Sequence, residues 1–185
     1  MNTRNFISLV LTLVFFLFTD SFSQQGWLSL PQNATNYDLN EVKFLNEMSG
    51  WACGELGTVI KTTNGGMNWS LINTGSSAYM NSVQFVNDMT GWIAADVNNF
   101  KKTTNGGASW INQLVPGTGL LDRCLALSDQ ICFASGKNGN LYRTTNGGAS
   151  WTVVHSSTAD YNRIFFINNL LYGRTVFGRN SDMQF

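Results

Sequence analysis

Short apolar runs separated by turn-forming residues make up most of the chain after its N-terminal segment. In the stretch 42–73, these runs fall at 42–46, 50–55, 58–63 and 68–73. They are rich in Val, Ile, Phe, Trp and Thr, and Gly, Asn and Asp interrupt them, as in strands joined by tight turns. No apolar period of 3.6 residues is long enough for a helix. The pattern therefore predicts an all-β chain of short antiparallel strands.

The same pattern returns every 41 residues. The word TTNGG stands at 62–66, 103–107 and 144–148, and the tryptophans that follow it keep the same interval. A four-stranded antiparallel unit at this period is a β-propeller blade, whose first strand lines the central channel. The blades are expected at about 42–73, 83–114 and 124–155, with a partial one at 163–185 and a stray strand at 26–31.

The first strand of each blade is expected to be the most buried. In the first copy, Val42 and Phe44 lie on one face and Leu45 on the other, so both faces are apolar.

Two arrangements fit these repeats. In a closed four-bladed ring, the stray strand at 26–31 would complete the last blade. In the second arrangement the chain is the front part of a longer propeller. We favour the second, because residues 163–185 lack a convincing third strand and an open blade edge is an aggregation hazard.

The repeated word has a structural explanation. Asn64, Gly65 and Gly66 tolerate positive φ, as a tight turn between the third and fourth strands requires. Trp69 follows three residues later, where its ring can pack on the sheet and the neighbouring blade. The equivalent residues are Asn105, Gly106, Gly107 and Trp110 in the second copy, and Asn146, Gly147, Gly148 and Trp151 in the third.

The N-terminal residues resemble a secretory signal peptide. Arg4 precedes the apolar run 6–18, and small residues stand at 21–23. This run is shorter than the roughly 20 residues that a membrane span needs. Residues 1–23 are therefore expected to be removed near Ser23, which leaves 24–185 as an exported propeller domain that is secreted, periplasmic or at the cell surface.

Composition narrows the possible partners and cofactors. The 11 basic and 11 acidic residues give a formal net charge of zero, so nucleic acid is not an expected partner. Cys53, Cys124 and Cys132 lie in apolar runs and are expected to be buried thiols. His155 is the only histidine, and no metal-ligand spacing is present. No metal, no cofactor and no membrane span after cleavage of the leader are expected.

The segments TTNGGMNW and TTNGGASW resemble the Asp-box, or BNR, repeat. With GW and GTVIKTTNGG added, the chain is similar to the propeller family of photosystem II stability and assembly factors over nearly all of residues 26–180. The resemblance implies a β-propeller fold. Asn64, Asn105 and Asn146 stand where the Asp-box has an acid, and Asn serves such a turn equally well.

The sequence contains no recognisable catalytic constellation. Sialidases and xyloglucanases on Asp-box propellers use an arginine cluster with a Tyr–Glu pair, or two facing acids, and neither can be matched here. The repeated cations Lys61, Lys102 and Arg143 precede TTNGG. We expect their side chains to lie over the blade surface, paired with an acid or stacked on Trp.

The segments entering the first strands are the candidate binding site, because they vary between copies while the turns do not. They should meet at one mouth of the channel, where an Arg–Tyr mixture suits peptide, carboxylate or sugar recognition. The candidate residues are Tyr37, Glu41, Tyr79, Arg123, Tyr161 and Arg163.

The sequence thus favours a secreted, non-enzymatic propeller that binds a protein or peptide or assists complex assembly. The alternative is a fragment of a carbohydrate-active enzyme or a sugar-binding propeller, with a glycan as ligand.

Overall fold

The computed structural model describes residues 34–96, 99–117, 120–137, 139–158, 160–167, 170–175 and 183–184. All of these residues belong to one compact unit of the chain. The expected signal peptide at 1–23 and the stray strand at 26–31 lie outside the described residues.

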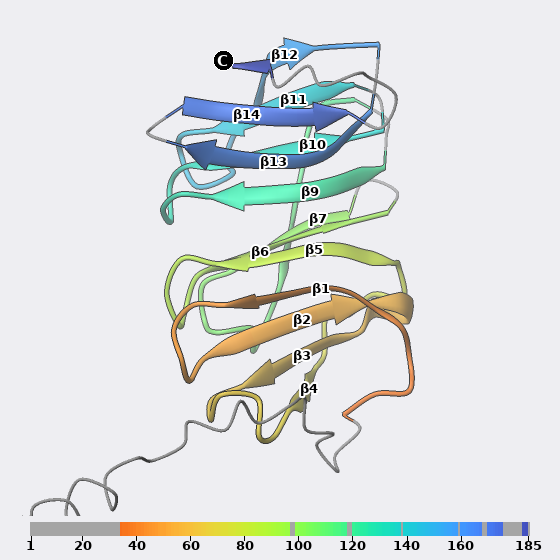
Figure 1. The fold of residues 1–185 in the computed structure, drawn as a ribbon, viewed down its shortest axis with the longest axis vertical. Coiled ribbons are helices and arrows are strands. Elements are labelled where there is room, and N and C mark those ends of the chain that lie inside the picture. The colour runs from red at the N-terminus through yellow and green to blue at the C-terminus, as the bar shows by residue number, and fades with distance from the viewer. Residues whose placement is uncertain are drawn as a thin grey trace, which may run out of the picture. The chain divides into compact units, whose positions relative to one another are not determined.

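The described part is all-β, and its strands form successive antiparallel sheets in chain order (Figure 1). Three sheets have four strands each, so the predicted propeller blades are confirmed. Blade 1 contains β1 (Leu39–Phe44), β2 (Gly50–Gly54), β3 (Val59–Thr62) and β4 (Ser70–Ile72), with a short 3-10 turn η1 (Glu55–Gly57). Blade 2 contains β5 (Met80–Phe85), β6 (Gly91–Ala95), β7 (Asn99–Thr103) and β8 (Ile111–Gln113). Blade 3 contains β9 (Leu121–Ala126), β10 (Cys132–Gly136), β11 (Asn140–Thr144) and β12 (Thr152–Ser156). Blade 4 contains β13 (Tyr161–Ile167), β14 (Leu170–Thr175) and β15 (Met183–Gln184).

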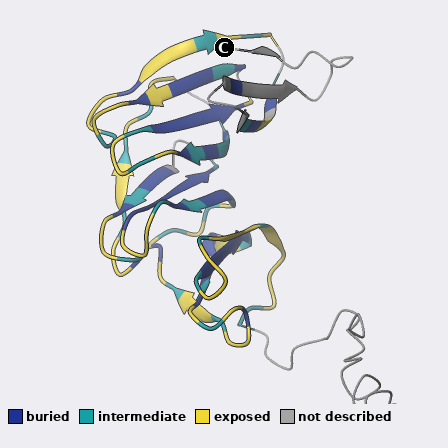
Figure 2. Cartoon of the chain, turned by 60° about the vertical axis from the view of Figure 1, so that its left-hand side comes forward, coloured by how far each residue is buried: buried dark blue, intermediate teal, exposed yellow. Residues whose placement is uncertain are grey.

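The first strand is not the most buried one, contrary to the expectation from its apolar residues. The second strand is buried at every position in blades 1, 2 and 3. It lies inside the sheet, paired on both edges, whereas β1, β5 and β9 pair on one edge only. β1 is the extreme case, since five of its six residues are exposed. In Figure 2 the strands inside the sheets, such as the second strand of each blade, are dark blue, whereas yellow exposed segments lie at the sheet edges.

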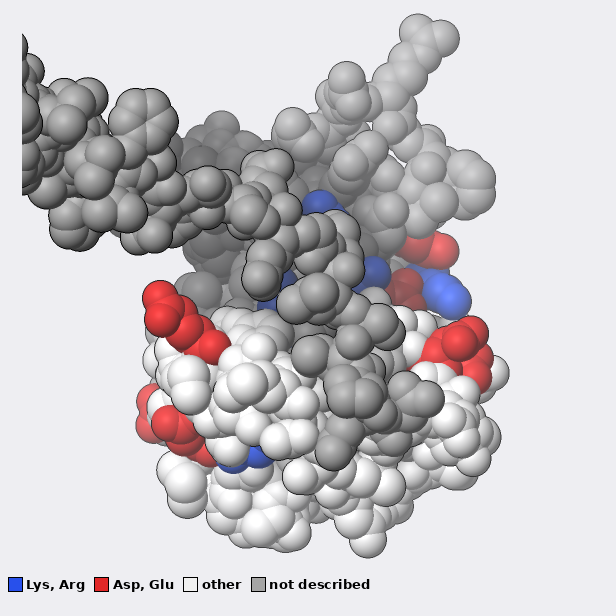
Figure 3. Space-filling view, turned by 60° about the horizontal axis from the view of Figure 1, so that its bottom comes forward, with Lys and Arg blue, Asp and Glu red and all other residues white. Residues whose placement is uncertain are grey.

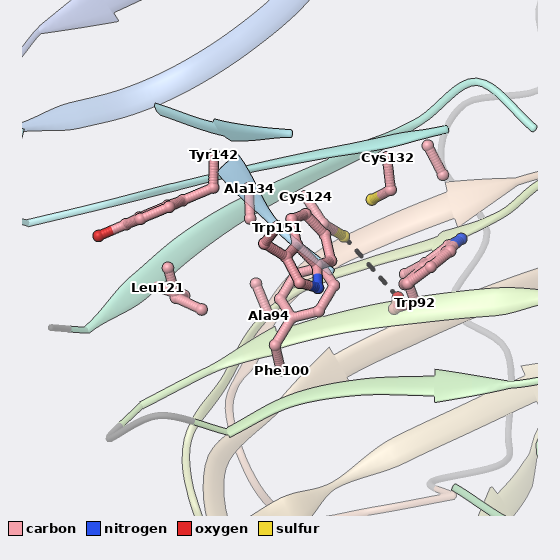
Figure 4. Packing of buried hydrophobic residues seen from close by; sticks show 10 residues of the cluster. Trp92, Ala94, Phe100, Leu121, Cys124, Cys132, Ala134, Tyr142 and Trp151 are labelled. Atoms are coloured by element: carbon pink, nitrogen blue, oxygen red, sulfur yellow. Dashed lines mark hydrogen bonds between the residues drawn. The ribbon is translucent and has the colours of Figure 1, made fainter. Parts of the chain in front are cut away.

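Aromatic packing between blades forms the core. Phe85 of blade 2 stacks on Trp51 of blade 1, with ring centroids 3.8 Å apart and an interplanar angle of 8°. Between blades 2 and 3, Trp151 meets Trp92 and Phe100 edge-on, at centroid distances of 6.1 and 5.0 Å (Figure 4). The thiol of Cys124 lies in the same cluster and points toward the carbonyl of Trp92. Cys53, Cys124 and Cys132 are all free and buried, which confirms the predicted buried thiols.

Gly50 and Gly91, which precede the core residues Trp51 and Trp92, each make room for a ring on the neighbouring strand. A Cβ at Gly91 would lie 2.6 Å from the ring of its cross-strand partner Phe85. Gly50 and Phe44 repeat this relation at 2.8 Å. In blade 3 the same pair is Cys132 and Ala126. In blade 3 the smaller residue of the pair stands on the first strand and the larger on the second, and neither carries a ring.

The TTNGG turn joins the third and fourth strands of each blade. In the first copy Gly65 and Gly66 adopt φ values of 69° and 89°, whereas Asn64 does not have positive φ. Its side chain has another role, because Asn64 Oδ1 accepts hydrogen bonds from Asn68 N and from Thr62 Oγ1, both at 2.9 Å. Thr62 Oγ1 also accepts from Gly66 N. The threonine hydroxyl and the asparagine amide thus hold the turn from both sides.

The repeated cation before TTNGG lies over the core aromatic residue, as predicted. Lys61 Nζ is 5.1 Å from the Trp51 ring centroid, and Arg143 Cζ is 5.6 Å from that of Phe133. Lys102 Nζ lies 4.5 Å from Trp92 and also donates hydrogen bonds of 2.9 Å to two carbonyls of blade 3. Lys61 and Arg143 thus contact the aromatic residue of their own blade, whereas Lys102 also links blade 2 to blade 3.

Candidate functional site

A β-bulge lies near the start of every innermost strand. The register shifts between Leu39 and Glu41 in β1 and at the corresponding place in β5, β9 and β13. A bulge re-aims the side chain beside it. The residues that follow the four bulges are Glu41, Ser82, Arg123 and Arg163. These positions are structurally equivalent, although the chemistry of their side chains differs from blade to blade.

Hydrogen bonds connect these positions from one blade to the next. Glu41 Oε2 accepts from Ser82 Oγ at 2.7 Å and from Val83 N at 2.9 Å. Ser82 Oγ in turn accepts from Cys124 N at 3.2 Å. Arg123 Nη1 donates to the Asn81 carbonyl at 2.9 Å. Both Glu41 and Arg123 are therefore held in place by the neighbouring blade.

The residues that precede the bulge positions make a second set of links. Asn40 Nδ2 donates to the Met80 carbonyl at 2.9 Å, and Asn81 Nδ2 donates to the Leu121 carbonyl at 3.1 Å. Asp122 replaces asparagine in blade 3, and burial raises the pKa of its carboxyl, an effect that Lys137 and Arg123 partly oppose. The inner strands are thus fixed to one another before any ligand arrives.

Three of the six predicted binding residues line one cleft of about 610 Å³ between the inner strands. They are Glu41, Arg123 and Arg163, which come from β1, β9 and β13. Lys43 also lines it, and its Nζ lies 3.9 Å from Glu41 Oε1. With three cations and one carboxylate among the described lining residues, the cleft is net positive.

The three tyrosines do not line this cleft. Tyr37 is exposed and lines a separate cleft of about 410 Å³ with Leu56 and Leu71. Tyr79 is exposed, and its carbonyl accepts from Asp96 N. Tyr161 is buried, and its hydroxyl lies 2.6 Å from His155 Nδ1. Tyr161 packs in the core between blades 3 and 4, with Phe133, Leu141 and Ile164.

Further cleft residues escaped the sequence analysis, although a signal for them exists. The lining includes the residues two positions beyond each bulge: Lys43, Gln84, Leu125 and Phe165. Residues at i and i+2 of a strand share a face. Counting two positions from Glu41, Ser82, Arg123 and Arg163 would have found them all.

The charged and polar side chains that line the cleft are suited to binding a ligand. Cys124 also lines it, but burial raises the pKa of this thiol to about 12, which keeps it protonated and unreactive. Among the described residues, no group of three or more His, Cys, Asp or Glu could hold a metal ion. Within the same part of the chain, no helix is long and apolar enough to cross a bilayer.

The sequence of residues 19–178 matches the family model described as photosynthesis system II assembly factor YCF48. The chain belongs to this family. The solved structure titled "YCF48 bound to D1 peptide" aligns with a TM-score of 0.67 and 22% identity, covering 80% of this chain and 50% of that one. YCF48 from Cyanidioschyzon merolae gives 0.62 and 21%, covering 85% of this chain and 57% of its own. The chain thus spans about half the length of these YCF48 structures.

Enzymes also share the fold. The GH74 enzyme from Niastella koreensis aligns with a TM-score of 0.63 and 18% identity, covering 74% of this chain and 26% of the enzyme. At such identities the likeness shows the fold alone. No curated protein sequence matches this chain significantly.

Proposed function

We propose that this YCF48-family propeller is a non-enzymatic binding module that captures a peptide segment of another protein in the cleft between its inner strands. The observation that carries the proposal is the position of Arg123 and Arg163. They come from neighbouring blades, follow equivalent bulges and line the same cleft.

The chemistry of the cleft suits an extended peptide that carries carboxylates. Guanidinium groups bind carboxylates through paired, charge-assisted hydrogen bonds. Val42, Leu125 and Ile164 add apolar lining between the charged groups. Glu41 would favour a basic or amide group at the opposite end of such a peptide, which would fix its direction.

Membership of the YCF48 family also favours a peptide as the ligand. A YCF48 structure contains a bound D1 peptide, and that observation belongs to that protein. Here it supports a peptide as the class of ligand, while the partner itself is to be identified by experiment. A glycosidase would need two carboxylates, and Glu41 is the only one among the described residues that line the cleft.

The module acts outside the cytoplasm in this proposal, in the secreted fraction, in a periplasm or at the cell surface. The support is the order of charge, apolar run and small residues at 1–23. Mass spectrometry of the protein isolated from its native source tests this, because a mature N-terminus near Gln24 is expected. An N-terminus at Met1 would contradict export by this leader.

Peptide binding is tested with an array of immobilised peptides of matched length that are acidic, neutral or basic. The wild-type chain is expected to retain acidic peptides, and less so at high salt. Arg123→Ala and Arg163→Glu should each weaken retention tenfold or more, because a charge-assisted hydrogen bond contributes about 1.5–3 kcal/mol.

Arg143→Glu is the matched control. It makes the same change of charge as Arg163→Glu at an exposed cation outside the cleft, and thermal melting verifies that it folds. Equal loss of peptide retention in all three variants would mean that the net charge of the protein, and not the cleft, explains the effect. Unchanged binding in both cleft variants would refute the site. Retention of glycans but of no peptide would favour the sugar-binding alternative.

A further inference from the structure

A groove of about 460 Å³ lies along the seam between blades 1 and 2. It is lined by the end of β3, the TTNGG turn and β4 of blade 1, and by the TTNGG turn of blade 2. The described residues that line it are all different from those that line the cleft between the inner strands. Its volume falls within the range of about 300–1,000 Å³ that is usual for small-molecule sites. We call it the seam groove.

Lys61 brings an ammonium group with available N–H groups to the seam groove. It lies over the Trp51 ring, but among the described residues it makes no hydrogen bond or ion pair. One repeat on, Lys102 Nζ donates hydrogen bonds of 2.9 Å to two carbonyls of blade 3. A Cβ at Gly147 would lie 2.8 Å from Lys102 Nζ, whereas one at the equivalent Gly106 would lie 3.8 Å from Lys61 Nζ. Lys61 is therefore the cation of the repeat that is left to bind a ligand.

The side-chain amide of Asn64 is a second available group in the seam groove. In the second copy of the turn, Asn105 Nδ2 donates to Ser109 Oγ at 2.8 Å, and the third copy repeats this bond. In the first copy Asn68 replaces the serine, and Asn64 Nδ2 has no hydrogen-bond partner among the described residues. Asn64 Oδ1 accepts from Asn68 N, so the turn fixes this amide while its N–H groups remain available.

The remaining lining of the seam groove is polar. Lys61 is the only charged side chain among the described residues that line it. Six lining residues carry an amide or a hydroxyl group: Thr63, Asn64, Asn68, Ser70, Asn73 and Asn105. Such groups both donate and accept hydrogen bonds, as the hydroxyls of a sugar do. Leu71, which is 65% exposed, adds an apolar surface for the C–H groups of a sugar ring.

The charge around blade 1 favours a ligand with few negative charges. In Figure 3, which brings the blade 1 end forward, most described atoms are uncharged, and Lys and Arg cover little of the surface on view. A polyanion that depends on many cations therefore finds few of them there. A single carboxylate is matched by the single ammonium group of Lys61.

We propose that the seam groove binds a sugar that carries a carboxylate, such as a uronic acid unit of a polysaccharide. The carboxylate accepts from Lys61 Nζ and Asn64 Nδ2, the hydroxyls bond to the other amide and hydroxyl groups, and the ring lies on Leu71. An extended peptide offers one N–H and one C=O for each step of about 3.3 Å. A sugar ring carries hydroxyls on adjacent carbons, which suits the closely spaced polar groups of the groove better. This site is additional to the peptide cleft.

The first test compares three probes by isothermal titration calorimetry. They are digalacturonate, the uncharged digalactose, and glutarate, which has carboxylates but no sugar ring. Digalacturonate is expected to bind roughly tenfold more tightly than digalactose, because only its carboxylates form charge-assisted hydrogen bonds, and its affinity should fall at high salt. Equal affinity for the two sugars would overturn the proposal, as would binding of glutarate as tight as that of digalacturonate. Absence of digalacturonate binding would refute it as well.

Variants then locate the bound sugar. Lys61→Met should weaken digalacturonate binding roughly tenfold, because the charge-assisted bond is lost. Lys137→Met is the matched control at an exposed lysine outside the groove and should bind as the wild type does. Arg163→Glu alters only the peptide cleft and should also keep the wild-type affinity for digalacturonate. Loss of binding in Arg163→Glu but not in Lys61→Met would place the sugar in the cleft and overturn the proposal.

Asn68→Ser separates binding from stability. The new serine hydroxyl is expected to accept from Asn64 Nδ2, as Ser109 accepts from Asn105 in the second copy. The melting temperature should therefore stay the same or rise, while the affinity for digalacturonate falls about threefold or more, because a hydrogen bond to the ligand is lost. Unchanged affinity in a variant that melts at or above the wild-type temperature would show that Asn64 does not bind the carboxylate, which contradicts the proposed site.

Discussion

Phe85 lies flat against Trp51 of the preceding blade, with ring centroids 3.8 Å apart, and forms a T-shaped pair with Trp110 of its own blade, with centroids 6.0 Å apart. A single side chain thereby connects the core of one blade to the turn tryptophan of the next. Trp51 lies in β2 and Phe85 in β5, while Trp110 directly precedes β8.

Phe85→Ala is expected to lower the free energy of unfolding by about 3–5 kcal/mol, because it leaves a cavity and removes the stacking on Trp51. Denaturant unfolding followed by tryptophan fluorescence measures the change. Leu114→Ala, at a 91% exposed position, should change stability by less than about 0.5 kcal/mol. Equal effects from the two substitutions would contradict the assignment of Phe85 to the core.

Gly91 and Phe85 are expected to be energetically coupled. Gly91→Cys alone should destabilise, because its Cβ would lie 2.6 Å from the Phe85 ring. Combining it with Phe85→Ala reproduces the pair that blade 3 uses, Cys132 opposite Ala126. The double variant should be more stable than the sum of the single changes predicts, by roughly 1–3 kcal/mol in a double-mutant cycle. Strict additivity would mean that the two positions do not share space.

The turn asparagine is expected to act through its side-chain oxygen. Asn105 Oδ1 accepts from Ser109 N at 2.9 Å, and Nδ2 donates to Ser109 Oγ at 2.8 Å. Asn105 Oδ1 also accepts from Thr103 Oγ1 at 2.9 Å, so Asn105→Ala removes three hydrogen bonds and should cost about 1–2 kcal/mol. Asn105→Asp should stay within about 0.5 kcal/mol of the wild type, because a carboxylate accepts both from the amide and from a rotated serine hydroxyl. Thermal unfolding compares the two, and a larger loss for Asp than for Ala would contradict this role.

Lys101 is expected to make the free energy of unfolding depend on pH in the alkaline range. Its side chain is buried, with Asn112 Oδ1 of the same blade accepting from Nζ at 2.7 Å, and burial lowers its pKa from the ordinary 10.5. The folded state therefore releases this proton at lower pH than the unfolded state does. The free energy of unfolding should rise with pH between the lowered pKa and about 10.5.

Lys101→Met should remove that part of the rise and should stabilise the protein near neutral pH by about 1–2 kcal/mol, since a desolvated charge is replaced by an apolar side chain. Blade 1 already has Ile60 at the equivalent position. Lys137→Met, at an exposed lysine, serves as the control and should leave the slope unchanged. Identical pH profiles for the wild type and Lys101→Met would disprove the expectation.

Local signals were sufficient for the fold and for part of the site. Runs of β-branched and aromatic residues, punctuated by Gly and Asn at an interval of 41 residues, predicted the four-stranded antiparallel blades that the structure contains. Of the candidate binding residues, Glu41, Arg123 and Arg163 meet in one cleft, while Tyr161 turns into the core. The tyrosines stand just before or at the start of a strand, and that place in the sequence says little about the direction of a side chain when a bulge follows.

The sequence by itself determined the repeat, the strands, the TTNGG turn and the family, because each rests on contacts within about 40 residues or on a pattern that recurs. Only the tertiary structure decided which copies of a residue are covered. Val42 and Val83 occupy the same position of the repeat, yet one is 55% exposed and the other 0%. Residues of blade 1 pack on Val83, and burial at an interface is a property of the neighbour as much as of the residue.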